Sequence, residues 1–141
     1  MRAWRAYLVG KELLEAQLNR DLHEEHQLAL ADYEVLLRLS EAPGGQIRMS
    51  TLAEQVASSK SRISHQVGRL EKAGLVRREE CAGDRRGVFA VLTEHGQEVL
   101  RRAAPTHVRA LRDNLIDLIS DQERLVLAEV FERVVSHLRE Q

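Results

Sequence analysis

Residues 58–70 gather side chains that donate hydrogen bonds and carry positive charge. Ser, Lys, Arg and His are donors suited to phosphate oxygens and to the N7 and O6 acceptors of guanine, so a helix that presents them can contact duplex DNA. We expect Arg62 and His65 to approach base edges. The residues expected mainly at phosphates, where they set the register, are Ser59, Lys60, Ser61 and Arg69, and Ser64 completes the set. A merely solvated helix face is the alternative interpretation.

A second basic segment follows at residues 81–87, with the sequence Cys-Ala-Gly-Asp-Arg-Arg-Gly. Arg85 and Arg86 lie between Gly83 and Gly87 at the tip of an expected hairpin. Such a tip allows a guanidinium to enter a narrow minor groove, where the potential is most negative. An ordinary polar turn is the alternative.

The two segments together differ in charge from the rest of the chain. Residues 58–87 contain eight Lys or Arg and four Asp or Glu and so carry +4, whereas the whole chain of 141 residues carries −1, which leaves −5 elsewhere. A nearly neutral protein therefore contains one basic region, as a nucleic-acid partner requires.

Three other groups of residues could bind a ligand or react. His23 and His26 are one helical turn apart, and His107 on a distant helix could approach them. Two histidines without a clear third ligand nevertheless favour a solvated helix end over a metal site. We therefore expect no metal. Cys81 could sense oxidants, but the chain has no second cysteine to form a disulfide with it. A thiol without a sensing role is therefore favoured. Apolar residues of the first two expected helices suit either the core or an effector pocket: Trp4, Tyr7, Tyr33 and Leu36.

Apolar periodicity and capping residues predict the elements that position these side chains. A long amphipathic helix is expected at about 3–26, a shorter one at 28–39, a short extended piece at 46–48, and a third helix capped by Ser50 or Thr51, with Thr51 and Glu54 as a capping box. Ser58 or Ser59 caps a fourth helix that ends at 73–74, two strands at 75–80 and 88–92 flank a seven-residue loop, and Thr93 caps a helix that can kink at Pro105 and continue to Leu118. A capping box at 120–123 begins the last helix.

The composition is that of a globular protein, 43% apolar and 30% charged, with few aromatic residues and two prolines, and it predicts one all-α or α+β domain. The N-terminus has no secretory apolar region and no stretch suits a membrane span, so a cytoplasmic protein without a membrane partner is expected. We see no phosphate loop, metal triad or activated nucleophile, and expect neither an enzyme nor a cofactor.

This order of elements resembles the MarR family of winged-helix transcription regulators over nearly the whole chain. The matching motifs are Leu52-Ala53-Glu54, residues 67–78, Asp84-x-Arg86 and residues 92–96. The resemblance implies an α+β, mainly α, winged helix-turn-helix and a homodimer on a pseudopalindromic operator, acting as a repressor; many members are also released by a small molecule. It further implies that Arg86 enters the minor groove and that Asp84 orients it, since a carboxylate near phosphate is otherwise unfavourable.

The resemblance also divides the chain. Residues 1–27 and 105–141 are expected to form dimerisation helices, and residues 28–104 the DNA-binding region. Two alternatives remain open: a metal- or oxidant-responsive sensor of the same fold, and a protein-interaction module that does not bind DNA.

Overall fold

The computed structural model describes residues 1–83 and 87–141, so Asp84, Arg85 and Arg86 lie outside the described residues. The helices and strands, in chain order, are α1 (Arg2–His26), α2 (Leu30–Glu41), a 3-10 turn (Pro43–Gly45), β1 (Gln46–Arg48), α3 (Met49–Gln55), α4 (Lys60–Lys72), β2 (Val76–Cys81), β3 (Asp84–Leu92), α5 (Glu94–Asn114), a second 3-10 turn (Ile116–Leu118) and α6 (Asp121–Arg139). The chain is therefore mainly helical with one small sheet, which confirms the expected fold class. Within the described residues, no helix has the length and apolarity needed to cross a membrane.

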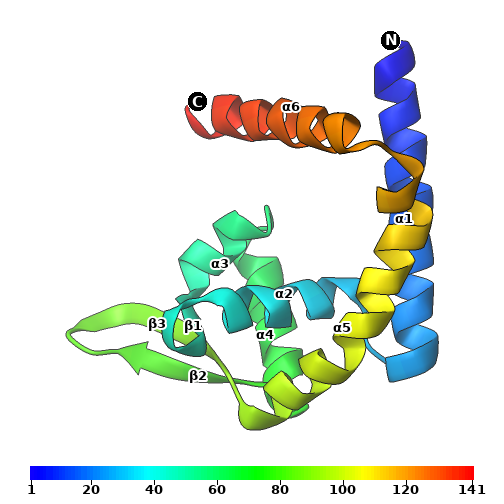
Figure 1. Cartoon of the computed structure of the whole chain (residues 1–141). Coiled ribbons are helices and arrows are strands. Elements are labelled where there is room, and N and C mark those ends of the chain that lie inside the picture. Colours follow the sequence, from blue (N-terminus) through cyan, green and yellow to red (C-terminus); the bar gives the residue numbers. More distant parts are fainter.

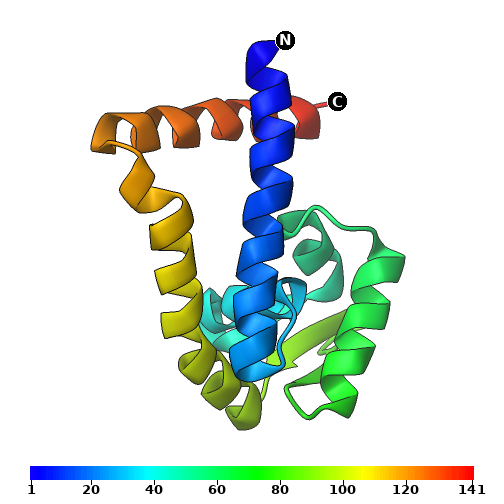
Figure 2. The ribbon, with the colours of Figure 1, turned by 90° about the vertical axis from the view of Figure 1, so that its right-hand side faces the viewer.

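The elements form a compact body attached to a column of two helices. α1 and α5 lie side by side, and α2, α3, α4 and the sheet are gathered at one end of this pair (Figures 1 and 2). At the other end, α6 runs crosswise to the column and extends away from it, near the N-terminus of α1 (Figure 1).

The sheet has three antiparallel strands in the order β1-β3-β2. Ile47 of β1 and Arg78 of β2 both pair with Ala90 of β3, so these three residues share one face of the sheet. Ala90 and Ile47 are buried, and this face packs on the helices. β2 continues to Cys81 and β3 begins at Asp84, so the expected seven-residue loop was too long: only Ala82 and Gly83 separate the two strands.

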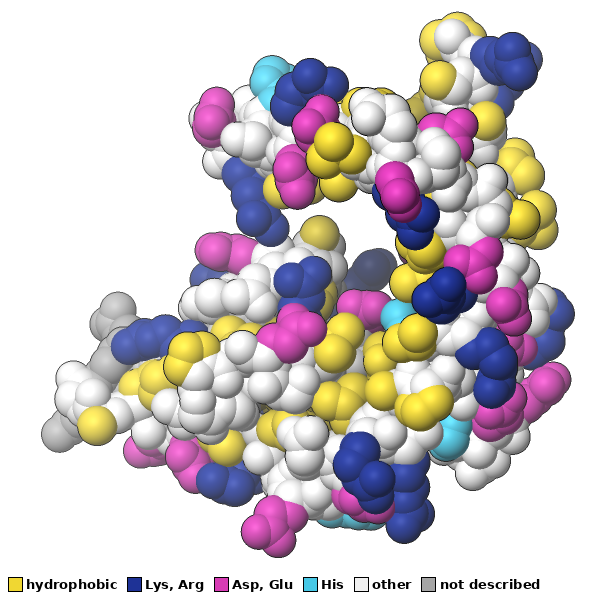
Figure 3. All heavy atoms as spheres, in the orientation of Figure 1, with side chains coloured by type: hydrophobic (Ala, Val, Ile, Leu, Met, Phe, Trp, Pro, Cys, Tyr) yellow, Lys and Arg dark blue, Asp and Glu magenta, His cyan; other side chains and the backbone are white. Residues whose placement is uncertain are grey.

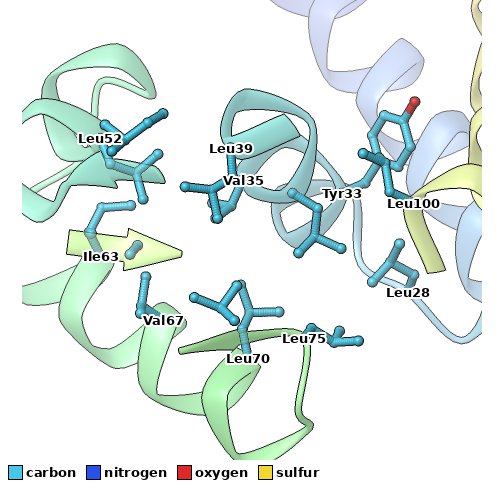
Figure 4. Packing of buried hydrophobic residues seen from close by; sticks show 14 of the residues in the cluster. Leu28, Tyr33, Val35, Leu39, Leu52, Ile63, Val67, Leu70, Leu75 and Leu100 are labelled. Carbon is cyan, nitrogen blue, oxygen red and sulfur yellow. The ribbon is translucent and has the colours of Figure 1, made fainter. Parts of the chain in front are cut away.

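The core lies where α2, α3, α4 and the sheet converge (Figure 4). Leu36 and Leu39 of α2 and Leu52 of α3 are fully buried, and Ile63 and Val67 of α4 face them. Removing five such side chains from water stabilises the fold by roughly 1.5–3 kcal/mol each. The apolar spacing of α4 therefore fixes which of its faces remains outside.

Several predicted boundaries needed correction. α3 begins at Met49, directly after β1, and no side chain caps it, so the predicted Thr51–Glu54 capping box was wrong. α2 begins at Leu30, and α5 passes Pro105 but ends at Asn114, before Leu118. The other predicted caps are confirmed: Ser59 Oγ accepts from Arg62 N, Thr93 Oγ1 accepts from Gly96 N, and Ser120 forms a capping box.

Candidate nucleic-acid interface

The α4 helix presents one apolar and one polar face. Ile63, Val67 and Leu70 are at most 3% exposed, and they hold the helix against the core (Figure 4). Ser61 and His65 lie one turn apart on the opposite side and are exposed. The helix thus turns hydrogen-bond donors outward on a rigid support.

The turn before α4 positions its start. Ser58 N donates to Ala53 O at 2.9 Å, and Ala57 takes a left-handed conformation with φ of 52°. Ser59 Oγ accepts from Arg62 N at 3.1 Å and so satisfies a first-turn amide. α3 and α4 are therefore joined by a short capped turn, as in a helix-turn-helix.

A carboxylate of α2 anchors one flank of α4. Asp32 is only 9% exposed; its Oδ1 accepts from Gln66 Nε2 at 3.0 Å, and its Oδ2 lies 3.6 Å from Arg69 Nη1. Arg69 was expected mainly at phosphates, and here its exposed guanidinium also has an intramolecular partner. Sequence reasoning missed Asp32 because its partners lie 34 and 37 positions away, on another helix.

The other flank of α4 is fastened to the base of the β2–β3 hairpin, which is called the wing below. Arg78 of β2 donates from Nη2 to Ser64 O at 2.5 Å, and Glu71 Oε2 accepts from Arg78 N at 3.0 Å. Gly68 faces the same guanidinium, with no side chain to push it away. Arg78 is a site residue that the sequence pattern did not single out.

A hollow of about 460 Å³ separates α4 from the wing. Basic and hydroxyl residues contribute most of its lining: Arg48, Ser50, Lys60, Ser64 and Arg78. Lys60 and Ser64, both in the predicted set, are thus brought together with three residues that were not predicted. The predicted wing residues Asp84, Arg85 and Arg86 lie outside the described residues, and Cys81 at the end of β2 is buried.

Two of the three histidines considered as metal ligands, His26 and His107, have other side-chain partners. His26 Nε2 lies 2.8 Å from Thr106 Oγ1, and His107 stacks on Tyr33 with ring centroids 4.4 Å apart. Burial lowers the pKa of His107, and Glu34 at 3.8 Å opposes that shift. Throughout residues 1–83 and 87–141, no three His, Cys, Asp or Glu side chains are grouped to hold a metal ion.

The Thr106 hydroxyl also donates to Glu25 Oε2 at 2.7 Å, and Arg109 Nη2 donates to Glu25 Oε1 at 2.8 Å. The hydrogen bond from Thr106, with the charge of Arg109 close by, lowers the pKa of the Glu25 carboxyl. These polar contacts tie the end of α1 to α5.

The four residues suggested for an effector pocket do not line one cavity. Trp4 and Tyr7 lie near the free end of α1, where Tyr7 contacts Phe131 of α6, whereas Tyr33 and Leu36 are buried in the core at the other end. Within one chain the structure therefore does not bring these four residues together, because α1 places its ends roughly 35 Å apart at ~1.5 Å per residue. Tyr33 and Leu36 instead match the alternative that they belong to the core. A hollow of about 650 Å³ lies elsewhere, between α1, α2 and the α3–α4 turn, and its polar lining includes Glu15, Glu34, Arg38, Arg62 and Gln66.

The α6 helix carries a broad apolar surface. None of its residues is buried, and these side chains are exposed: Leu125, Val126, Leu127, Val130, Val134, Val135 and Leu138. The outer half of α1 is similar, and Figure 3 shows hydrophobic side chains at its N-terminal end.

Comparison with known proteins agrees with this geometry. A family model described as the MarR family matches residues 26–87. The chain is 35% identical over 95 residues to the transcriptional regulator HosA of Escherichia coli, which covers 67% of this chain and 69% of HosA. It is 30% identical over 128 residues to the HTH-type transcriptional regulator PecS of Dickeya dadantii, which covers 89% and 75% of the two chains.

Two solved structures from Streptomyces coelicolor superpose over almost the whole chain. AbsC, a MarR family transcriptional regulator, is 48% identical with a TM-score of 0.92, covering 99% of this chain and 93% of AbsC. Sco3205, a MarR family transcriptional regulator solved in complex with DNA, is 42% identical with a TM-score of 0.93, covering 96% and 88%.

Proposed function

This chain belongs to the MarR family of transcriptional regulators, and from that premise we propose that it is a repressor that binds a pseudopalindromic operator as a homodimer. In this proposal α4 enters the major groove and the wing enters the minor groove. One observation carries it: α4 is held by a buried apolar face while Ser61 and His65 point outward from the opposite face.

The proposal assigns separate roles to the donors. His65 and Arg62 read base edges, and the remaining donors of α4 contact phosphates and fix the register. Arg86, oriented by Asp84, is the minor-groove residue, and Arg85 lies beside it; these roles follow from the sequence and the family. The 42% identical Sco3205, whose structure contains DNA, supports the choice of partner.

The apolar surfaces of α6 and of the outer half of α1 support the homodimer. Most helical stability in proteins comes from packing of an apolar face, and none of the 19 residues of α6 is buried in its own chain. A second copy of the chain offers the same apolar surface, and a twofold axis would bring the two surfaces together. Residues 1–27 and 105–141 are then the dimerisation helices, and residues 28–104 the DNA-binding region.

The hollow between α1, α2 and the α3–α4 turn supports the proposal that a small molecule releases the protein from DNA. Arg62 and Gln66 of α4 line it together with Arg38 of α2, so an occupant would contact the reading helix itself. Its volume of about 650 Å³ is within the usual range for small-molecule sites. An effector bound there could favour an orientation of α4 that no longer fits the groove.

Selection of bound duplexes from a random pool tests the proposal. We expect an enriched pseudopalindrome whose half-sites lie about one helical turn, ~10 base pairs, apart, because a twofold dimer places two α4 helices in successive major grooves. Enrichment of a single half-site would contradict the dimer. A pool that shows no enrichment, or affinity for duplex DNA that does not fall as salt rises, would contradict DNA binding itself.

A further inference from the structure

The hollow between α4 and the wing has the chemistry of an anion site. Arg48, Lys60 and Arg78 contribute three basic residues, and Ser50 and Ser64 add two hydroxyl residues. Among the described residues that line it, none is acidic. A phosphodiester is the one anion that the proposed function brings to this face in quantity.

The position of the hollow on α4 matches the wall of a major groove. Ser61 and His65 point away from the core, whereas Lys60 and Ser64, one turn apart, lie on the flank that faces the wing. A helix with side chains is about 10–12 Å wide and the major groove about 12 Å, so the flanks of an inserted helix meet the sugar-phosphate backbone. The base-reading face and this flank therefore contact different parts of the duplex.

The Arg78 guanidinium is already held in place at the hollow. Its Nη2 donates to Ser64 O at 2.5 Å and lies 3.4 Å from Ser64 Oγ, which fixes the side chain across the gap between β2 and α4. A guanidinium has five N–H donors, and these contacts engage only one nitrogen. Because its orientation is set before DNA arrives, little side-chain entropy is lost on binding a phosphate.

The geometry points to this hollow as the binding site for one backbone phosphate of the operator, which Arg78 and Lys60 bind together. This inference rests on the proposed function and deepens it, since it adds Arg78 to the contacts predicted from sequence and gives Lys60 a defined partner. Arg78 then has two roles: it joins the wing to α4, and it neutralises the phosphate between them.

Removal of the charge at Arg78 tests the phosphate-binding site, and removal of the charge at Arg77 is the control. Arg78→Gln removes the charge and retains a polar amide side chain, and Arg78→Lys keeps the charge. Arg77→Gln removes the same charge one residue away, on the opposite face of β2, where Arg77 Nε pairs with Glu79 Oε1 at 2.8 Å. Circular dichroism and thermal unfolding check that each variant folds.

We expect the slope of log affinity against log salt to become less steep in Arg78→Gln, by about 1 for each bound protomer. This corresponds to a roughly fivefold loss of affinity per protomer at ~0.15 M salt. The loss should be equal for operator and unrelated duplexes, and Arg78→Lys should restore the slope. Equal slopes for Arg78→Gln and Arg77→Gln would contradict the phosphate-binding site while leaving the proposed function intact. A wild-type chain without salt-dependent duplex binding would instead contradict the proposed function.

Duplexes with single methylphosphonate substitutions locate the contact. We expect one position per half-site at which loss of the phosphate charge weakens the wild type but not Arg78→Gln, because that variant has already lost the contact. Additive losses at every position would overturn the assignment. Inorganic phosphate, titrated at constant ionic strength, should compete no better against the wild type than against Arg78→Gln; selective competition would show a free-anion site instead.

Discussion

At the scale of single residues, one glycine determines how closely the start of α5 approaches the wing. A Cβ added to Gly96 would lie 2.1 Å from the Leu75 carbonyl oxygen. That oxygen accepts a hydrogen bond from Thr93 N at 3.2 Å, and the Thr93 hydroxyl donates to Gly74 O at 2.6 Å. The neighbouring backbone is thus held by hydrogen bonds on both sides and cannot retreat without losing them.

Gly96→Ala should therefore lower the free energy of unfolding by about 1–3 kcal/mol, the usual cost of overpacking a rigid site. Gly10→Ala is the matched control, because nothing lies within 4 Å of a Cβ at that position in α1. It should raise stability by roughly 0.5–1 kcal/mol through helix propensity. Urea unfolding measures both changes, and a Gly96→Ala variant as stable as Gly10→Ala would show that the α5 start can move.

His65 and Lys60 should affect DNA binding in different ways. His65 lies on the outward face of α4, so His65→Ala should relax the sequence preference and cost about 1–3 kcal/mol on the operator alone. Lys60 lies on the flank beside the wing, so Lys60→Ala should weaken all duplexes alike and reduce the salt slope. Binding to the operator and to single-base variants of it measures both profiles; identical profiles would refute this division of roles.

At the scale of elements, local signals predicted the order and type of the helices and strands, whereas contacts between elements could not be predicted. The Ser59 cap and the Ile63, Val67 and Leu70 spacing are local, and the structure confirms them. Asp32 and Arg78 position α4 through partners that are distant in sequence, and no periodicity reveals such pairs. The Thr51–Glu54 box failed for a similar reason: β1 leads directly into α3, so the helix starts before its best capping residue.

The junction of α1 and α5 should respond to acid through Glu25. Its pKa is lowered in the folded chain by the hydrogen bond from Thr106, with Arg109 and His26 also facing it. A carboxyl with a lowered folded pKa contributes stability above its unfolded pKa, near 4.5, and loses that contribution as pH falls through the folded value. Thermal unfolding from pH 7 to pH 3 should show the wild type losing more stability than Glu25→Gln, so that the two converge in acid.

Glu24→Gln provides the control for that experiment, because Glu24 is the exposed neighbour of Glu25 and its substitution removes the same charge. It should follow the wild-type pH dependence. If Glu25→Gln also runs parallel to the wild type, the contact with Thr106 and Arg109 does not stabilise the junction.

At the scale of the whole molecule, the chain has a buried core at one end and an exposed apolar helix at the other. α6 contacts its own chain through few side chains, among them Phe131, whose ring centroid lies 5.0 Å from that of Tyr7, and Arg139, which donates to Glu54 O at 3.0 Å. Its apolar residues recur over most of its circumference, while Glu129, Glu132 and Ser136 lie along the remaining side. That asymmetry gives the proposed dimer a testable face.

Val134→Glu should convert the proposed dimer to monomers, because it places a charge in the middle of the apolar face, where a partner chain would desolvate it. Ser136→Glu introduces the same charge two residues later, on the polar side of α6, and should remain dimeric. Sedimentation measures the mass of each variant, and the operator should be bound far more weakly by Val134→Glu alone, since a monomer engages one half-site at a time.

A Val134→Glu chain that sediments as a dimer would place the interface on another surface. A monomeric Val134→Glu chain with wild-type affinity would show that dimerisation is not required for binding the operator.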